Sequence, residues 1–241
     1  MRVIQWAGDS ICTTNKYKTF PQTGIAQAFD RYTKGDVVIY NHSINGRSTK
    51  SFIDQNRLAV IYDELSSGEF LFIQFGHNDE KKADPLRYTE PQGEYRDNLA
   101  KFVNVARDRA AYPLFITPLE RRHFKENGEI ETPSQHEAYV RAMKDTAAEL
   151  EVPLVDLFTM SRNFLIKTGD EASKKYFMNL APGEVEWCPE GKQDDSHLKY
   201  EGAMLFGKMV AEGLLQVGGV YADLIADPDA LRASMDIEDN G

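Results

Sequence analysis

The sequence predicts an α/β domain in which a parallel β-sheet is covered by helices on both faces. Two observations lead to this fold class: short apolar runs alternate with amphipathic stretches along the 241 residues, and polar motifs directly follow the first three runs. The strand-like runs are residues 3–7, 37–40, 70–75, 114–117 and 153–157. Five strands separated by helices favour a three-layer, flavodoxin-like arrangement with strand order 2-1-3-4-5.

Amphipathic patterns between and after these runs predict the helices. They lie near residues 24–32, 56–65, 95–111, 134–150, 157–167 and 200–215. Three connections are longer than the loops of most compact domains, and such loops are often functional. They are residues 80–93, 118–133 and 179–196, and we expect them to wall a cleft.

The length suits one domain, because 241 residues can bury a single sizeable core. We therefore expect one domain over residues 1–241, with a core of about 3–215 and a C-terminal extension of about 216–241. The acidic tail from about Asp227 has few apolar residues, so its last residues are expected to be mobile.

Composition restricts the possible partners. A net charge of −10 argues against nucleic acid or an anionic membrane surface, since both require a basic face. No apolar run approaches the ~20 residues that span a bilayer, and the run after Met1 is too short for a signal peptide, so a cytoplasmic location is expected. The oligomeric state is not indicated.

Neither a metal nor a cofactor is expected. The five histidines show no zinc-ligand spacing, and the first strand does not end in a Gly-rich phosphate loop. Cys12 and Cys188 form no disulfide framework, so two ordinary thiols are expected. The histidines are His42, His77, His123, His136 and His197.

Two motifs at opposite ends of the chain supply the parts of a serine nucleophile. Gly8-Asp9-Ser10 ends the first strand, and Asp194-Asp195-Ser196-His197 precedes the last helix. A serine needs a histidine to accept its proton and a carboxylate to orient that histidine. Either aspartate could serve, although the three-residue spacing favours Asp194 over Asp195. Asp9 is expected to shape the turn.

Two motifs in the middle of the chain supply oxyanion donors. Asn45-Gly46-Arg47-Ser48 and Gly76-His77-Asn78-Asp79 each follow a strand-like run. The amides of Ser10 and Gly46 and the side chain of Asn78 are suitable donors for a tetrahedral oxyanion. The alternative is that Asn45-Gly46 and Asn78 only form turns. We expect His77 to hydrogen-bond behind the site rather than to act as a second base.

The four motifs, in this order, resemble those of the SGNH (GDSL-like) hydrolases. The segments 46–52, 75–79 and 194–197 look most like the rhamnogalacturonan acetylesterases, and the resemblance runs from about Val3 to about Leu215. It implies the SGNH hydrolase fold and a metal-free serine esterase that removes O-acetyl groups from rhamnogalacturonan-derived oligosaccharides. One departure is Gly24-Ile25-Ala26, where the family tends to have Gly-Trp-Gly.

Two other functions stay open. One is another esterase of the same superfamily, such as a lysophospholipase or thioesterase, and the other is a non-enzymatic flavodoxin-like protein that binds a ligand. The first would need an apolar acyl channel, whereas the loops expected around the cleft are rich in charged residues. The second would not need Ser10, Asp194 and His197 together.

A pectic substrate would be negatively charged, as is the protein. We therefore hypothesise a local positive rim formed by the loops after the third and fourth strands, in which arginines contact galacturonate carboxylates directly. Arg121 and Arg122 are the main candidates, and Arg47 and His77 are further candidate substrate contacts. The alternative, equally open from the sequence, is that the loops carry only solvated charges of both signs. The basic residues are Lys81, Lys82, Arg87, Arg121, Arg122, His123 and Lys125, and the acidic ones Glu80, Asp84, Glu120 and Glu126.

Overall fold

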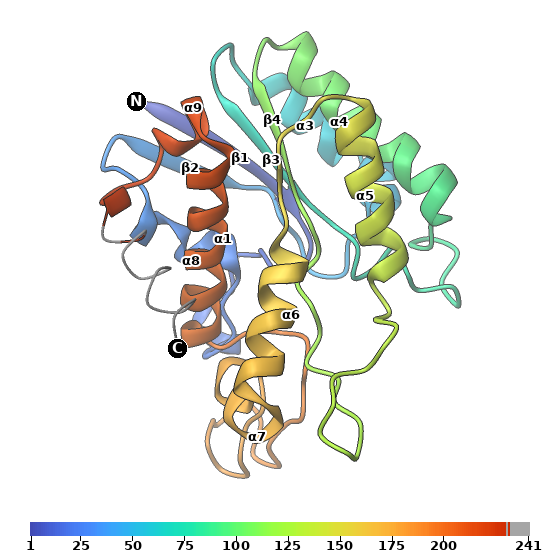
Figure 1. Ribbon diagram of the computed structural model, residues 1–241, viewed down its shortest axis with the longest axis vertical. Coiled ribbons are helices and arrows are strands. Elements are labelled where there is room, and N and C mark those ends of the chain that lie inside the picture. The colour runs from blue at the N-terminus through green and yellow to red at the C-terminus, as the bar shows by residue number, and fades with distance from the viewer. Residues whose placement is uncertain (230, 232–241) are drawn as a thin grey trace.

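Five parallel strands form the centre of the molecule, in the order β2-β1-β3-β4-β5 (Figure 1). The computed structural model describes residues 1–229 and residue 231, so most of the acidic tail lies outside the described residues. The strand order is the predicted one. The strands are β1 (Arg2–Gly8), β2 (Val37–Asn41), β3 (Phe70–Gln74), β4 (Tyr112–Ile116) and β5 (Leu154–Val155).

Helices cover both faces of this sheet (Figure 1). Because side chains alternate along a strand, Phe70 and Phe72 of β3 face one layer while Leu71 and Ile73 face the other. The first layer contains α1, α6 and α8, and the second contains α2, α3, α4 and α5. The larger helices are α3 (Arg57–Glu64), α4 (Arg96–Asp108), α5 (Glu137–Glu149), α6 (Leu157–Thr168) and α8 (Tyr200–Val217).

Short helical turns complete the structure. They are α1 (Ile25–Ala28), α2 (Thr49–Asp54), α7 (Asp170–Ser173), α9 (Gly219–Ala222), the 3-10 turns Tyr17–Thr19, Phe29–Tyr32 and Lys174–Tyr176, and the π-helical turn Pro91–Tyr95. Among the described residues, no helix has the length and apolar character required to cross a membrane.

Two predicted elements differ from the observed ones, and one short helix was not predicted. The helix expected at 24–32 is α1 followed by a 3-10 turn. The strand expected at 153–157 ends at Val155, because the Asp156 side chain accepts a hydrogen bond from the Thr159 amide and starts α6 there. Helix α2 was not predicted, since its six residues are too few to show a period. Its start is set by Ser48, which exchanges hydrogen bonds with Ser51.

The parallel arrangement brings the first three polar motifs to one edge of the sheet. Gly8 of β1 is in register with Gln74 of β3, and Trp6 is in register with Asn41 of β2, so the segments that follow these strands start side by side. The fourth motif, just before α8, reaches the same edge. Cys12 and Cys188 are both free thiols, as expected.

Candidate active site

The turn after β1 places Ser10 at the sheet edge. A Cβ atom on Gly8 would lie 3.0 Å from both the Gln74 carbonyl and the Ser43 hydroxyl oxygen, so a side chain at this position would require these neighbours to shift. Asp9 is buried, and its Oδ1 accepts a hydrogen bond from the Ile11 amide at 2.9 Å, which closes the turn. Burial raises the pKa of Asp9 to about 6. Asp9 therefore holds the turn that presents Ser10.

Ser10, His197 and Asp194 form one chain of hydrogen bonds. The Ser10 Oγ lies 2.9 Å from His197 Nε2, and His197 Nδ1 lies 2.8 Å from Asp194 Oδ2. The other oxygen of Asp194 accepts the backbone amides of Ser196 and His197 at 3.0 and 2.9 Å. These contacts fix the carboxylate and the imidazole in one tight turn, which is the arrangement that a serine nucleophile and its base require.

Asp194 stays ionised in this turn. Partial burial by itself would raise its pKa, but the hydrogen bond and charge of His197, its backbone amide and the Lys192 ammonium outweigh burial. The pKa of Asp194 is consequently held well below its usual range. An ionised Asp194 accepts from Nδ1–H of His197, which leaves Nε2 free to accept the Ser10 proton.

The neighbouring Asp195 points to other partners. Its Oδ1 lies 2.7 Å from Arg122 Nη1 and 3.0 Å from Asn179 Nδ2. Of the two aspartates that the sequence left open, the structure places Asp194 on the imidazole and Asp195 on a buried arginine.

The two expected oxyanion donors lie in the same cavity as Ser10. This cavity has a volume of about 260 Å³, and Gly46 and Asn78 line it together with His197. Gly46 has a φ of +74°, a left-handed conformation that favours glycine. The cavity thus combines a serine, its base and two hydrogen-bond donors.

The amide group of Asn78 is held in one orientation. Its Oδ1 accepts from Arg87 Nη1 at 3.2 Å, and its Nδ2 donates to the Arg47 carbonyl oxygen at 3.1 Å. Arg87 is itself held by Asp84 at 2.5 Å. The second proton of Nδ2 is not needed by Arg47, so it is the one that can face a ligand in the cavity. The sequence offered no sign of this role of Arg87.

Asp79 joins the two loops that carry Gly46 and Asn78. It is fully buried and accepts from the Thr49 amide at the start of α2, from the Thr49 hydroxyl and from the Thr89 hydroxyl. Burial raises its pKa to about 7 although these donors act against that shift. The carboxyl of Asp79 therefore fixes the position of α2 relative to the loop after β3.

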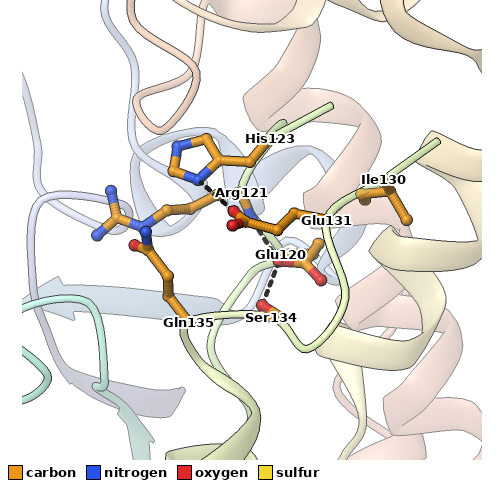
Figure 2. Close-up of a pocket in the computed structure, with 7 residues that line it drawn as sticks. All are labelled: Glu120, Arg121, His123, Ile130, Glu131, Ser134 and Gln135. Carbon is orange, nitrogen blue, oxygen red and sulfur yellow. Dashed lines mark hydrogen bonds and ion pairs between the residues drawn. The ribbon is translucent and has the colours of Figure 1, made fainter. Parts of the chain in front are cut away.

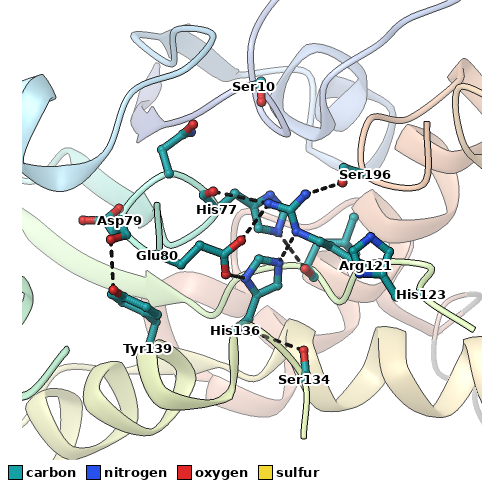
Figure 3. A network of polar contacts seen from close by, with 12 residues as sticks. Ser10, His77, Asp79, Glu80, Arg121, His123, Ser134, His136, Tyr139 and Ser196 are labelled. Carbon is teal, nitrogen blue, oxygen red and sulfur yellow. Dashed lines mark hydrogen bonds and ion pairs between the residues drawn. The ribbon is translucent and has the colours of Figure 1, made fainter. Parts of the chain in front are cut away.

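Figure 3 shows a polar network behind the cavity, built around the guanidinium of Arg121. Arg121 donates to Ser196 Oγ at 2.5 Å, to Glu80 Oε1 at 2.9 Å, to His136 Nε2 at 3.2 Å and to the His77 carbonyl at 3.3 Å. Glu80 also lies 2.7 Å from His136 Nδ1. Arg121 thereby links the loop before α8 to the loop after β3.

Two buried histidines belong to this network (Figure 3). The rings of His77 and His136 stack with their centroids 4.2 Å apart, and His77 Nε2 lies 2.8 Å from the Leu119 carbonyl oxygen. Burial lowers the pKa of both histidines well below the usual value, and Arg121 contributes to both shifts. Both rings are therefore neutral near pH 7.

The charged loop after β4 differs from the predicted positive rim. Arg122 is only 4% exposed and is paired with Asp170 and Asp195, so it is not available for a direct substrate contact and that expectation is wrong. Figure 2 shows two contacts within this loop: His123 faces Glu131 at 3.6 Å, and Glu120 accepts from Ser134 at 2.7 Å. Other charges of the loop are paired with residues outside it, Glu120 with Arg162 and Arg121 with Glu80.

Of the other three residues expected to contact the substrate, two line the cavity and one does not. Arg121 and His77 line the cavity, whereas Arg47 does not. The Arg47 side chain donates instead to Gln55 at 2.7 Å and to the Asn45 carbonyl at 3.1 Å. Over the described residues, no group of three or more His, Cys, Asp or Glu side chains is arranged to hold a metal ion.

Residues 7–202 match the model of the GDSL-like Lipase/Acylhydrolase family. The chain is 37% identical over 212 residues to the rhamnogalacturonan acetylesterase RhgT of Bacillus subtilis (strain 168), covering 88% of this chain and 89% of that protein. It is also 37% identical over 215 residues to a probable rhamnogalacturonan acetylesterase, YesY, of the same strain, covering 89% of this chain and 93% of that protein.

Two solved structures share the fold at low sequence identity. Protein YXIM of Bacillus subtilis superposes with a TM-score of 0.73 at 19% identity, over 91% of this chain but only 57% of that protein's length. An acetylxylan esterase from Geobacillus stearothermophilus has a TM-score of 0.60 at 16% identity, over 91% of this chain and 95% of that one.

Proposed function

Because the chain belongs to the GDSL-like lipase/acylhydrolase family, we propose that it is a serine esterase that removes O-acetyl groups from carbohydrates, and from rhamnogalacturonan-derived oligosaccharides in particular. The observation that carries this proposal is the hydrogen-bonded chain Ser10–His197–Asp194, which opens into a cavity that Gly46 and Asn78 also line. The choice of substrate is supported by the two Bacillus relatives at 37% identity.

The proposed reaction has two stages. In the first, Ser10 Oγ attacks the ester carbonyl carbon while His197 Nε2 takes the hydroxyl proton. The amides of Ser10 and Gly46 and the Nδ2 of Asn78 stabilise the oxyanion. When the tetrahedral intermediate collapses, the C–O bond to the sugar breaks and His197 returns its proton to the leaving sugar oxygen.

The second stage removes the acetyl group from Ser10. A water molecule attacks the acetyl carbonyl, His197 Nε2 accepts the water proton, and the same donors stabilise the second oxyanion. Collapse releases acetate and returns the proton to Ser10 Oγ. Asp194 holds Nδ1–H throughout, so the imidazolium formed in each stage is stabilised by an ionised carboxylate.

The size and lining of the cavity favour a short acyl group. Its volume of about 260 Å³ is below the roughly 300–1,000 Å³ of clefts that enclose drug-sized ligands. Among its described lining residues, Ile11 is the one aliphatic side chain, and the others include Lys81, Arg121 and Asp194. A lysophospholipase or thioesterase would need an apolar channel for its acyl chain, so these alternatives are disfavoured.

The test compares p-nitrophenyl acetate with p-nitrophenyl octanoate, and then measures acetate release from acetylated rhamnogalacturonan oligosaccharides. We expect the acetate ester to be preferred by at least about tenfold in kcat/KM, the effect of a few unfavourable methylene contacts. Ser10→Ala should lose about 10⁴- to 10⁶-fold in kcat, because it removes the nucleophile.

Each alternative has its own outcome in this experiment. Preference for octanoate would indicate a long-chain acylhydrolase. Binding of the oligosaccharide without hydrolysis of any ester would indicate a ligand-binding protein. Retention of a tenth of the wild-type turnover by Ser10→Ala would show that the nucleophile lies elsewhere.

A further inference from the structure

Lys81 contributes a positive charge to the wall of the catalytic cavity. It follows Asn78 by three residues and lines the same cavity as Ser10 and His197, while remaining exposed to solvent. In the part of the chain that the structure describes, no hydrogen bond or ion pair engages its Nζ atom. Lys81 therefore differs from the other cations of the two charged loops, whose side chains are mostly paired.

Three carboxylates close in sequence to Lys81 are held by other groups, the buried Asp79 by Thr49 and Thr89. Glu80 is bound by Arg121 at 2.9 Å and lies 2.7 Å from His136. Asp84 is bound by Arg87 at 2.5 Å and caps the Leu86 amide at 3.1 Å. None of these carboxylates can turn to Lys81 without giving up these contacts.

The carboxylate of the cavity itself is also engaged. Asp194 is bound to His197 and, at 2.7 Å, to Lys192. The pKa of Lys81 is lowered, first because partial burial removes some of the hydration of its ammonium, and then because the guanidinium groups of Arg87 and Arg121 are near. Glu80 and Asp9 have smaller effects in the opposite direction. Arg87 and Arg121 are themselves paired with Asp84 and Glu80, so the ammonium of Lys81 is the charge of this group that has no ion-pair partner among the described residues.

Arg121, the other cation of the cavity, is not equivalent to Lys81. Its guanidinium already donates to Glu80, His136, Ser196 and the His77 carbonyl, so its charge is compensated and most of its N–H groups are used. Among the described residues that line the cavity with Ser10, Lys81 is therefore the cation whose ammonium has no hydrogen-bond or ion-pair partner and can bind an anionic group.

We infer that Lys81 forms a carboxylate subsite of the catalytic cavity and binds the uronate of an acidic oligosaccharide while an acetyl group lies at Ser10. This inference rests on the proposed esterase function, and it names a residue that would favour acidic over neutral oligosaccharides as substrates. A galacturonate residue carries a carboxylate that Lys81 can bind, whereas an acetylated xylooligosaccharide carries none. A single ammonium acts here as a point charge and steers the ligand without demanding one orientation.

The experiment compares Lys81→Ala with the matched control Lys82→Ala. Lys82 is the adjacent residue, has the same charge and does not line the cavity, so both variants change the net charge equally. The substrates are acetylated rhamnogalacturonan oligosaccharides, the same oligosaccharides after reduction of their carboxylates to alcohols, and p-nitrophenyl acetate.

We expect Lys81→Ala to raise KM for the acidic oligosaccharide about fivefold to tenfold at low ionic strength, the size of one partly exposed ion pair. The effect should shrink at high salt because the pair is screened. Lys81→Arg should restore most of the affinity, and Lys82→Ala should behave as the wild type. All variants should hydrolyse the reduced oligosaccharide and p-nitrophenyl acetate alike.

Equal KM values for Lys81→Ala and Lys82→Ala on the acidic oligosaccharide would overturn the subsite while leaving the esterase function intact. So would an equal rise in KM on the reduced substrate, since that would indicate a general loss of sugar contacts. Failure of the wild-type protein to deacetylate the acidic oligosaccharide would overturn the proposed substrate and the subsite together.

Discussion

The two adjacent aspartates before α8 offer the sharpest test of the site. Asp194 contacts His197 Nδ1 at 2.8 Å, whereas Asp195 contacts Arg122 at 2.7 Å. The same chemical change at neighbouring positions should therefore damage two different properties. We predict that Asp194→Asn mainly lowers turnover and that Asp195→Asn mainly lowers stability.

The loss in Asp194→Asn follows from the histidine tautomer. An asparagine can turn its NH₂ group toward His197 Nδ1, and the ring then carries its proton on Nε2, where it can no longer accept the Ser10 proton. A change of this kind costs about 10⁴-fold in kcat, with a small effect on KM. The backbone amides of Ser196 and His197 can still bind the remaining side-chain oxygen, so the turn itself should persist.

The loss in Asp195→Asn follows from the burial of Arg122. The Arg122 side chain is 4% exposed and keeps Asp170 as a second carboxylate partner, while Asp195 is 32% exposed. Breaking a fully buried pair would cost several kcal/mol, but solvent screening of Asp195 and the remaining partner reduce the expected loss to about 1 kcal/mol of unfolding free energy. Turnover should stay within about threefold of the wild type, because the Asp195 carboxylate is bonded to Arg122 and Asn179 and the His197 imidazole to Asp194.

Steady-state hydrolysis of p-nitrophenyl acetate measures the first effect, and urea unfolding at the same pH measures the second. Kinetics should be run at 25 °C, where both variants are folded. The reverse ranking of kcat would show that Asp195 orients the histidine and that the arrangement of the turn has been misread. Equal losses of kcat in both variants would show that the loop moves as a unit when either carboxylate is changed.

Two further predictions concern groups around the cavity. Asn78→Ala should lower kcat by about 10² to 10³ with little change in KM, because it removes an oxyanion donor. Arg87→Ala should lower kcat about tenfold, because the Asn78 amide loses its orienting donor. An unchanged kcat in Arg87→Ala would mean that the Arg47 carbonyl alone orients Asn78. In urea titrations, the wild type should lose stability as pH falls below about 6.5, because unfolded His77 and His136 take up protons that the folded rings refuse, at about 1.4 kcal/mol per pH unit for each histidine. In His136→Gln, the slope of unfolding free energy against pH should be smaller by about 1.4 kcal/mol per pH unit, since one fewer proton is taken up on unfolding. A slope identical to that of the wild type would contradict the neutral, buried state of His136. Asp79, whose pKa is raised to about 7, has the opposite effect on the pH dependence of stability. Its contribution to the free energy of unfolding is complete below about pH 4 and is lost as the pH rises from about 4 to 7.

Much of the architecture could be predicted from the sequence, because it depends on local patterns. The alternation of apolar runs and amphipathic stretches is enough to indicate a parallel sheet, and the strand order 2-1-3-4-5 that this pattern favours is the observed one. Short elements were harder to predict from the sequence. Helix α2 spans only Thr49–Asp54 and begins where the Ser48 side chain and the buried Asp79 satisfy its first amides, and Asp79 comes from a loop thirty residues away.

The sequence by itself determined which residue types are present for the chemistry: a serine after the first strand, an Asp-x-x-His turn before the last long helix, a glycine after the second strand and an asparagine after the third. Only the tertiary structure decided which charges are free to act on a ligand. Arg121, Arg122 and Lys81 look alike as basic residues in long loops, yet Arg122 is buried between Asp170 and Asp195, Arg121 joins Glu80 and His136, and Lys81 lines the cavity without an ion-pair partner among the described residues. The physical reason is that an ion pair depends on distance and burial. Arg122 and Asp195 are 73 positions apart in the chain, and only the packing of their loops brings their charged groups to 2.7 Å.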